Sequence, residues 1–160
     1  MPATQERRER IARLVEDQWE SEDEFDQFFA TITDPEELHL FAYHFNMGTG
    51  IGELRKVVQH PLCDRGTLLL VYWRLSPGWF HASGMEITSS AQQEQHALLK
   101  DVEQRYLMGE HASAVIFFDP RRFRGGDLIA GNEQYGGLAH VAPKMFEPTS
   151  GVPVRPLWGA

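Results

Sequence analysis

The sequence has few of the features that would place a protein in a membrane or in an oxidising compartment. Its longest run of aliphatic and aromatic residues spans residues 68–73, far short of the roughly 20 residues that a membrane span needs. Its single cysteine, Cys63, excludes an internal disulfide and is typical of a reducing environment. The first residues are rich in Arg and Glu and lack the apolar stretch of a secretory signal. We therefore expect a cytoplasmic protein without membrane contact.

Spacings typical of metal and phosphate sites are also missing. None of the seven histidines forms a His-x-x-x-His pair, and His39 and His44 would lie on different faces of a helix. Gly48, Gly50 and Gly52 follow a predicted helix, whereas a phosphate-binding glycine loop follows a strand. The sequence therefore predicts neither a metal site nor a bound cofactor.

Length and composition are those of one globular domain. Of the 160 residues, 42% are hydrophobic and 24% are charged, and a chain of this size buries about 68–70% of its unfolded surface. Residues 120–160 contain seven of the fourteen glycines and five of the nine prolines. We expect a single domain over residues 1–160, with a helical body at 4–109 and a packed, loop-rich tail at 110–160.

Apolar residues at helical spacing dominate the helical body, and capping residues indicate where its helices begin. A first helix is predicted over residues 4–20. Ser21 and Glu24 form a capping box that opens a second helix with an aromatic inner face. The dipeptide Asp34-Pro35 opens a third, with Glu37 as the capping-box partner of Asp34.

Three more helices are predicted further along the chain. They cover residues 51–59, residues 67–75 after a cap at Asp64, and residues 90–108 after Ser89. The segment 67–75 is apolar nearly all round and could also be an inner strand, but neighbouring helices favour a helix. We therefore predict a mainly α fold, an irregular bundle or stack of about six helices. The tail is mostly loop, with room for a short hairpin.

Negative charge is concentrated near the N-terminus. Residues 1–40 contain four basic and twelve acidic residues and so carry the whole net charge of −8, while the other 120 residues contain eleven of each sign. No Lys or Arg occurs between Glu16 and Glu37. Such a segment repels nucleic acid and attracts a basic protein. A solvated helix face that only aids solubility is the alternative.

From this charge pattern we predict a surface that binds a basic partner protein. The predicted contact residues are Glu16, Asp17, Glu20, Glu22, Asp23, Glu24, Asp26, Glu36 and Glu37.

Two other groups of residues are candidates for chemistry. His60, Cys63 and Asp64 would be the centre of a small hydrolase or metal-assisted enzyme, but a carboxylate beside a thiol raises its pKa, which favours a structural cysteine in a tight turn. The second group is the basic sequence at 121–124, Arg-Arg-Phe-Arg. It could contact phosphates, but in an acidic protein we expect these arginines to pair with the chain's own acids.

Residues 38–80 contain a His-Pro-x-Cys-Asp-x-Gly-Thr core, which begins at His60. Together with Asn46 and Gly50 before it and Tyr72-Trp73 and Ser76-Pro77 after it, this segment resembles a bacterial family known as a domain of unknown function. Residues 118–120, Phe-Asp-Pro, are similar to a second patch of that family. Its members have Trp and Asp after the asparagine, where this chain has Met47-Gly48-Thr49.

The resemblance implies no activity, but small helical proteins of this kind often accompany bacterial toxin genes as immunity proteins. Joined to the acidic segment, it leads to the hypothesis of an immunity protein that neutralises a secreted antibacterial toxin, for instance a nuclease, by covering its basic active-site surface. A helical scaffold subunit is a further hypothesis. The sequence leaves the oligomeric state open.

Overall fold

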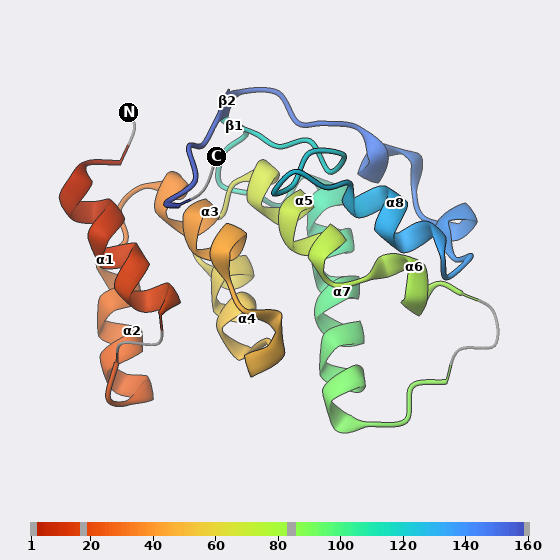
Figure 1. The fold of residues 1–160 in the computed structure, drawn as a ribbon, viewed down its shortest axis with the longest axis horizontal. Coiled ribbons are helices and arrows are strands. Elements are labelled where there is room, and N and C mark those ends of the chain that lie inside the picture. The colour runs from red at the N-terminus through yellow and green to blue at the C-terminus, as the bar shows by residue number, and fades with distance from the viewer. Residues whose placement is uncertain (1–2, 17–18, 83–85, 159–160) are drawn as a thin grey trace.

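The computed structural model of the protein describes residues 3–16, 19–82 and 86–158, which form a row of helical hairpins (Figure 1). Eight helices lie in this described part of the chain, and six of them have seven residues or more, which confirms the predicted fold. The helices are α1 (Gln5–Val15), α2 (Glu22–Ala30), α3 (Pro35–His44), α4 (Gly52–Gln59), α5 (Arg65–Arg74), α6 (Pro77–Phe80), α7 (Ser90–Met108) and α8 (Leu128–Glu133). No helix in the described ranges is both long and apolar enough to cross a bilayer.

Side-chain caps begin α2, α3, α5 and α7 at the predicted residues. Ser21 Oγ accepts a hydrogen bond from Glu24 N (3.2 Å), but the Glu24 carboxylate accepts from Glu20 N (2.7 Å) rather than from the cap residue itself. Asp34 Oδ1 accepts from the backbone N–H of Glu36 (2.9 Å). The predicted Asp34–Glu37 capping box does not form, because Glu37 is used elsewhere. Helix α1 ends at Val15, five residues before its predicted end.

Helix α5 is the centre of the fold and packs against both α3 and α7. Residues 66–73 are all buried, so the segment that could also have been an inner strand is a helix. An all-round apolar helix requires neighbours on every side, and the tail supplies one of them. The indole N–H of Trp73 donates to the carbonyl oxygen of Met145 (2.6 Å), which ties the tail to the core.

The tail is mostly loop and crosses the top of the helical row (Figure 1). Its strands β1 (Ile116–Phe117) and β2 (Val152–Pro153) pair in parallel, with Ile116 opposite Val152. A hairpin-like turn occurs at residues 123–126, where the residues at both ends exchange backbone hydrogen bonds and Arg124 and Gly125 have positive φ angles of 50° and 75°. This is the geometry of a two-residue type I′ turn.

The C-terminal segment lies across α1 and α3. The Arg8 guanidinium donates to the carbonyl oxygens of Arg155 (3.0 Å) and Pro156 (2.5 Å). The backbone N–H of Leu157 donates to His44 Nε2 (2.8 Å), and the ring of Trp158 packs edge-on against His44. These contacts fix residues 155–158 beside the N-terminal helices.

Candidate protein-binding surface

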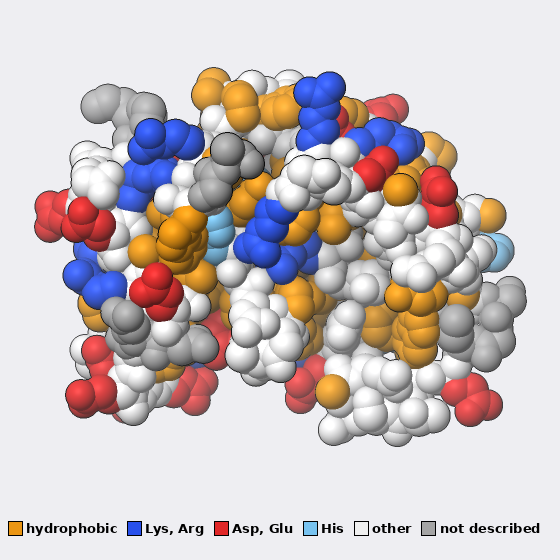
Figure 2. All heavy atoms as spheres, viewed as in Figure 1, with side chains coloured by type: hydrophobic (Ala, Val, Ile, Leu, Met, Phe, Trp, Pro, Cys, Tyr) orange, Lys and Arg blue, Asp and Glu red, His pale blue; other side chains and the backbone are white. Residues whose placement is uncertain are grey.

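Acidic residues gather at the N-terminal end of α2. The first turn of this helix contains three acids, and Glu20 and Asp26 extend the group on either side. Figure 2 shows acidic side chains at the lower left, over the lower ends of α1 and α2. We call this group the α2 surface; it comprises Glu20, Glu22, Asp23, Glu24 and Asp26.

One cation of the chain itself is bound to the α2 surface. Lys56, from α4, donates from Nζ to Glu22 Oε1 (3.1 Å) and to Asp26 Oδ1 (2.7 Å). Its Nζ also lies 5.1 Å from the centre of the Phe25 ring. The hydrogen bond to Asp26 is the main cause of the raised pKa of Lys56. The α2 surface therefore has the geometry to hold an alkylammonium group between two carboxylates and an aromatic face.

Two other acids of this surface are exposed to solvent. The carboxylates of Glu20 and Asp23 are exposed and form no hydrogen bond or ion pair with any residue that the structure describes. The Glu24 carboxylate is engaged at the helix N-terminus, as described above. Glu16 caps the C-terminal end of α1, and Asp17 lies outside the described residues.

The last two predicted contact residues do not belong to the α2 surface. Glu37 is buried and pairs with Arg7 Nη1 (3.1 Å); burial raises the pKa of Glu37, against the lowering effect of Arg7. The prediction that Glu37 contacts a partner is therefore wrong, because α1 packs on α3 and covers it. Glu36 accepts from Ala3 N (2.8 Å) and faces a groove beside the strands.

Aromatic residues next to the α2 surface belong mainly to the core. Phe25 and Phe29 are buried and stack on each other with ring centres 5.4 Å apart. Trp19 and Phe28 are only partly buried, and the Trp19 ring lies 5.0 Å from that of Phe25. Trp19 and Phe28 are thus the aromatic groups within reach of a partner at this end of the molecule.

The three residues of the enzyme hypothesis each have a structural contact. The Cys63 thiol donates to the carbonyl oxygen of Asp64 (3.9 Å), and burial raises its pKa to about 12. His60 Nδ1 accepts from the backbone N–H of Leu62 (3.1 Å), and its ring packs edge-on against Phe29. Neither contact brings a base to the thiol. In the described part of the chain, no three His, Cys, Asp or Glu side chains converge as a metal site would require.

Asp64 connects two distant segments. Its Oδ1 accepts from the backbone N–H groups of Gly66 (2.8 Å) and Ile116 (3.3 Å). Its Oδ2 accepts from the Ser113 hydroxyl (2.6 Å) and the Val115 backbone N–H (2.8 Å). This fully buried carboxylate thus caps α5 and positions the chain that enters β1.

We expect Cys63 to be unreactive in the folded protein. A thiol with a pKa near 12 holds almost no thiolate at pH 7.5, and burial also blocks access. Incubation with iodoacetamide, followed by mass spectrometry, should leave the native protein unmodified over an hour and label it completely in 6 M guanidinium chloride. Rapid labelling of the native protein would revive the enzyme hypothesis.

The arginines of the 121–124 segment are largely engaged within the chain, as predicted. Arg121 and Arg122 lie 3.7 and 3.9 Å from the carboxylates of Asp127 and Asp119. Arg124 pairs with no acid in the described part of the chain. It donates to the Tyr43 carbonyl oxygen (2.8 Å), and its guanidinium lies over the rings of Tyr43 and Phe123.

One family of known proteins matches the middle of the chain. The sequence profile of a family described as Domain of unknown function (DUF4274) matches residues 33–107, which run from the cap of α3 nearly to the end of α7. Helices α1 and α2 and the tail, including residues 118–120, lie outside the match. No curated protein and no solved structure shows significant similarity to this chain.

Proposed function

We propose that this protein binds a basic partner protein through the α2 surface, and that the partner is a secreted toxin that it neutralises as an immunity protein. The observation that supports the proposal is the binding of Lys56 by Glu22, Asp26 and the ring of Phe25. A surface that holds this ammonium group can hold those of a partner at the neighbouring Glu20 and Asp23.

In this proposal, charge guides the encounter and apolar contact holds the complex. A single exposed ion pair contributes only about 0.2–1 kcal/mol, so the α2 carboxylates would chiefly accelerate association and select a basic surface. Trp19 and Phe28, partly buried beside them, are the groups that could lose further water contact and anchor the partner. Neutralisation then follows by occlusion, because the partner's cationic residues are no longer available to its substrate.

Reversing the two exposed charges should weaken the complex mainly through its rate of formation. We expect the double variant Glu20→Lys, Asp23→Lys to associate at least about tenfold more slowly with the partner at low salt, because attraction becomes repulsion. The tagged wild-type chain would first be used to isolate the partner from the native host. Association rates of the purified pair would then be measured by surface plasmon resonance between 50 and 500 mM salt.

The matched control reverses two exposed acids elsewhere, Glu94 on α7 and Glu133 on α8. The variant Glu94→Lys, Glu133→Lys has the same net charge as the test variant, so a similar loss of rate in both would assign the effect to total charge and contradict the proposal. For the immunity role, expression of the isolated partner alone should arrest growth, and co-expression of this chain should restore it. A harmless partner would contradict that role.

A further inference from the structure

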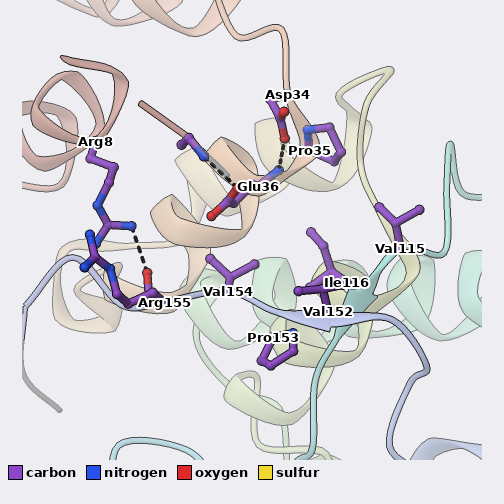
Figure 3. A pocket seen from close by; sticks show the side chains of 11 residues that line it. Arg8, Asp34, Pro35, Glu36, Val115, Ile116, Val152, Pro153, Val154 and Arg155 are labelled. Atoms are coloured by element: carbon purple, nitrogen blue, oxygen red, sulfur yellow. Dashed lines mark hydrogen bonds between the residues drawn. The ribbon is translucent and has the colours of Figure 1, made fainter. Parts of the chain in front are cut away.

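A groove of about 530 Å³ lies between the strands and the N-terminal ends of α1 and α3 (Figure 3). Its floor is aliphatic: Val115 and Ile116 come from the first strand region, and Val152 and Val154 from the second. Figure 2 shows hydrophobic side chains as a band at the top of the view, where Figure 1 places β1 and β2. The groove is thus an exposed apolar site of the size that holds small ligands.

Two valines of this floor are strongly exposed to solvent. Val152 is 72% exposed and Val115 is 56% exposed, and a backbone hydrogen bond joins the two residues directly. The neighbouring Pro153 has no backbone N–H, so a further strand cannot complete a hydrogen-bond ladder along this part of β2. A small molecule therefore fits the groove better than an added peptide strand.

One end of the groove carries two arginines, and neither forms an ion pair with a residue that the structure describes. Arg8 is only 8% exposed, and its guanidinium donates to the two backbone carbonyl oxygens of the C-terminal segment. The Arg155 guanidinium is exposed and forms no ion pair with any residue in the described ranges. Figure 3 shows both side chains at the same end of the groove. Burial lowers the pKa of Arg8, the charge of Glu36 raises it, and the repulsion between Arg8 and Arg155 lowers it further. An anion placed between them would relieve this repulsion.

The carboxylates at the other side of the groove each accept a backbone hydrogen bond. Asp34 Oδ1 accepts from the backbone N–H of Glu36, and Glu36 Oε2 accepts from that of Ala3. Asp34 also caps the N-terminus of α3, whose dipole favours its negative charge. The arginine end is therefore where an anion can be received, because the exposed Arg155 guanidinium there forms no ion pair with a described residue.

We propose that this groove binds a small molecule with an anionic group on an apolar body, in the class of medium-chain carboxylates. The carboxylate lies between Arg8 and Arg155, and the hydrocarbon chain lies along Val154, Val152 and Val115. The site is separate from the α2 surface and does not depend on the function proposed above.

Octanoate tests the site, with octylammonium as the matched probe of opposite charge. In isothermal titration calorimetry with the full chain, octanoate should bind at least about tenfold more tightly than octylammonium. Arg155→Gln and Val152→Asp should each weaken octanoate binding at least about tenfold; both positions are exposed, so the fold should persist by circular dichroism. Arg122→Gln, which removes an equally cationic exposed residue away from the groove, should bind octanoate like the wild type.

Several results would overturn the proposal. These are no octanoate binding at 10 mM, equal affinity for the two probes, or equal losses in the Arg122 and Arg155 variants. Charge-reversed α2 variants should retain octanoate binding, which makes failure of this site distinguishable from failure of the protein-binding proposal.

Discussion

Replacement of Asp64 by alanine is expected to lower the free energy of unfolding by about 4 kcal/mol. The carboxylate is fully buried and accepts four hydrogen bonds, three from backbone N–H groups and one from the Ser113 hydroxyl. Its removal leaves the buried N–H groups of Gly66 and Ile116 without this acceptor and breaks two partly buried hydrogen bonds. Each buried unsatisfied donor costs about 1–3 kcal/mol. Chemical denaturation followed by tryptophan fluorescence would measure the loss.

Two further variants make this prediction specific. Asp64→Asn keeps the acceptor Oδ1 but places an amide against Val115 N–H, so we expect an intermediate loss of about 2 kcal/mol. Asp101→Ala removes a carboxylate that is 39% exposed in its side chain and pairs with Arg105 one turn away. Such a pair contributes less than about 1 kcal/mol. If Asp64→Ala were no more destabilising than Asp101→Ala, the structural role of Asp64 would be refuted.

Residues of the segment that carried the family resemblance make structural contacts in the core. Asp64 joins α5 to β1, and Thr67 Oγ1 lies 3.0 Å from Nδ1 of His39 in the core. Burial lowers the pKa of His39 to about 4, so this pair is neutral at pH 7. These contacts give both Asp64 and Thr67 a structural role at this spacing.

Local patterns predicted the helices because their signals lie within a few residues. Helix α7 begins after Ser89, as predicted, where Ser89 and Gln92 form a complete capping box, and Gly109 ends the same helix in the left-handed conformation. The strand pairing could not be predicted in this way. Ile116 and Val152 are 36 residues apart, and a two-residue strand has no alternation to reveal it.

The candidate site was predicted only in part for the same reason. The sequence located the acids but not the partner of each, since Lys56 reaches Glu22 and Asp26 from another hairpin and Arg7 reaches Glu37 from α1. The groove depends on α1, α3 and both strands together. No single segment of the sequence carries a signal for it.

Replacement of Gly66 by alanine is expected to destabilise the protein by about 2 kcal/mol, although alanine is the better helix former. A Cβ at Gly66 would lie 2.5 Å from the carbonyl oxygen of Ile116. That oxygen cannot move freely, because it accepts a hydrogen bond from the Thr149 hydroxyl (2.7 Å). The backbone N–H of Ile116 is also held, since it donates to Asp64. Displacing a packed segment costs about 1–3 kcal/mol, more than the gain of about 1 kcal/mol in helix propensity.

Gly131, inside α8, is the matched control. A Cβ there meets nothing within 4 Å, so Gly131→Ala should raise the free energy of unfolding by about 0.5–1 kcal/mol. The two variants make the same chemical change in a helix and differ only in what the new methyl group meets. If chemical denaturation shows that Gly66→Ala lowers the free energy of unfolding and Gly131→Ala raises it, the difference reports the close approach of α5 to β1. If both substitutions raise it, α5 and β1 leave room for a methyl group at Gly66, and the prediction is wrong.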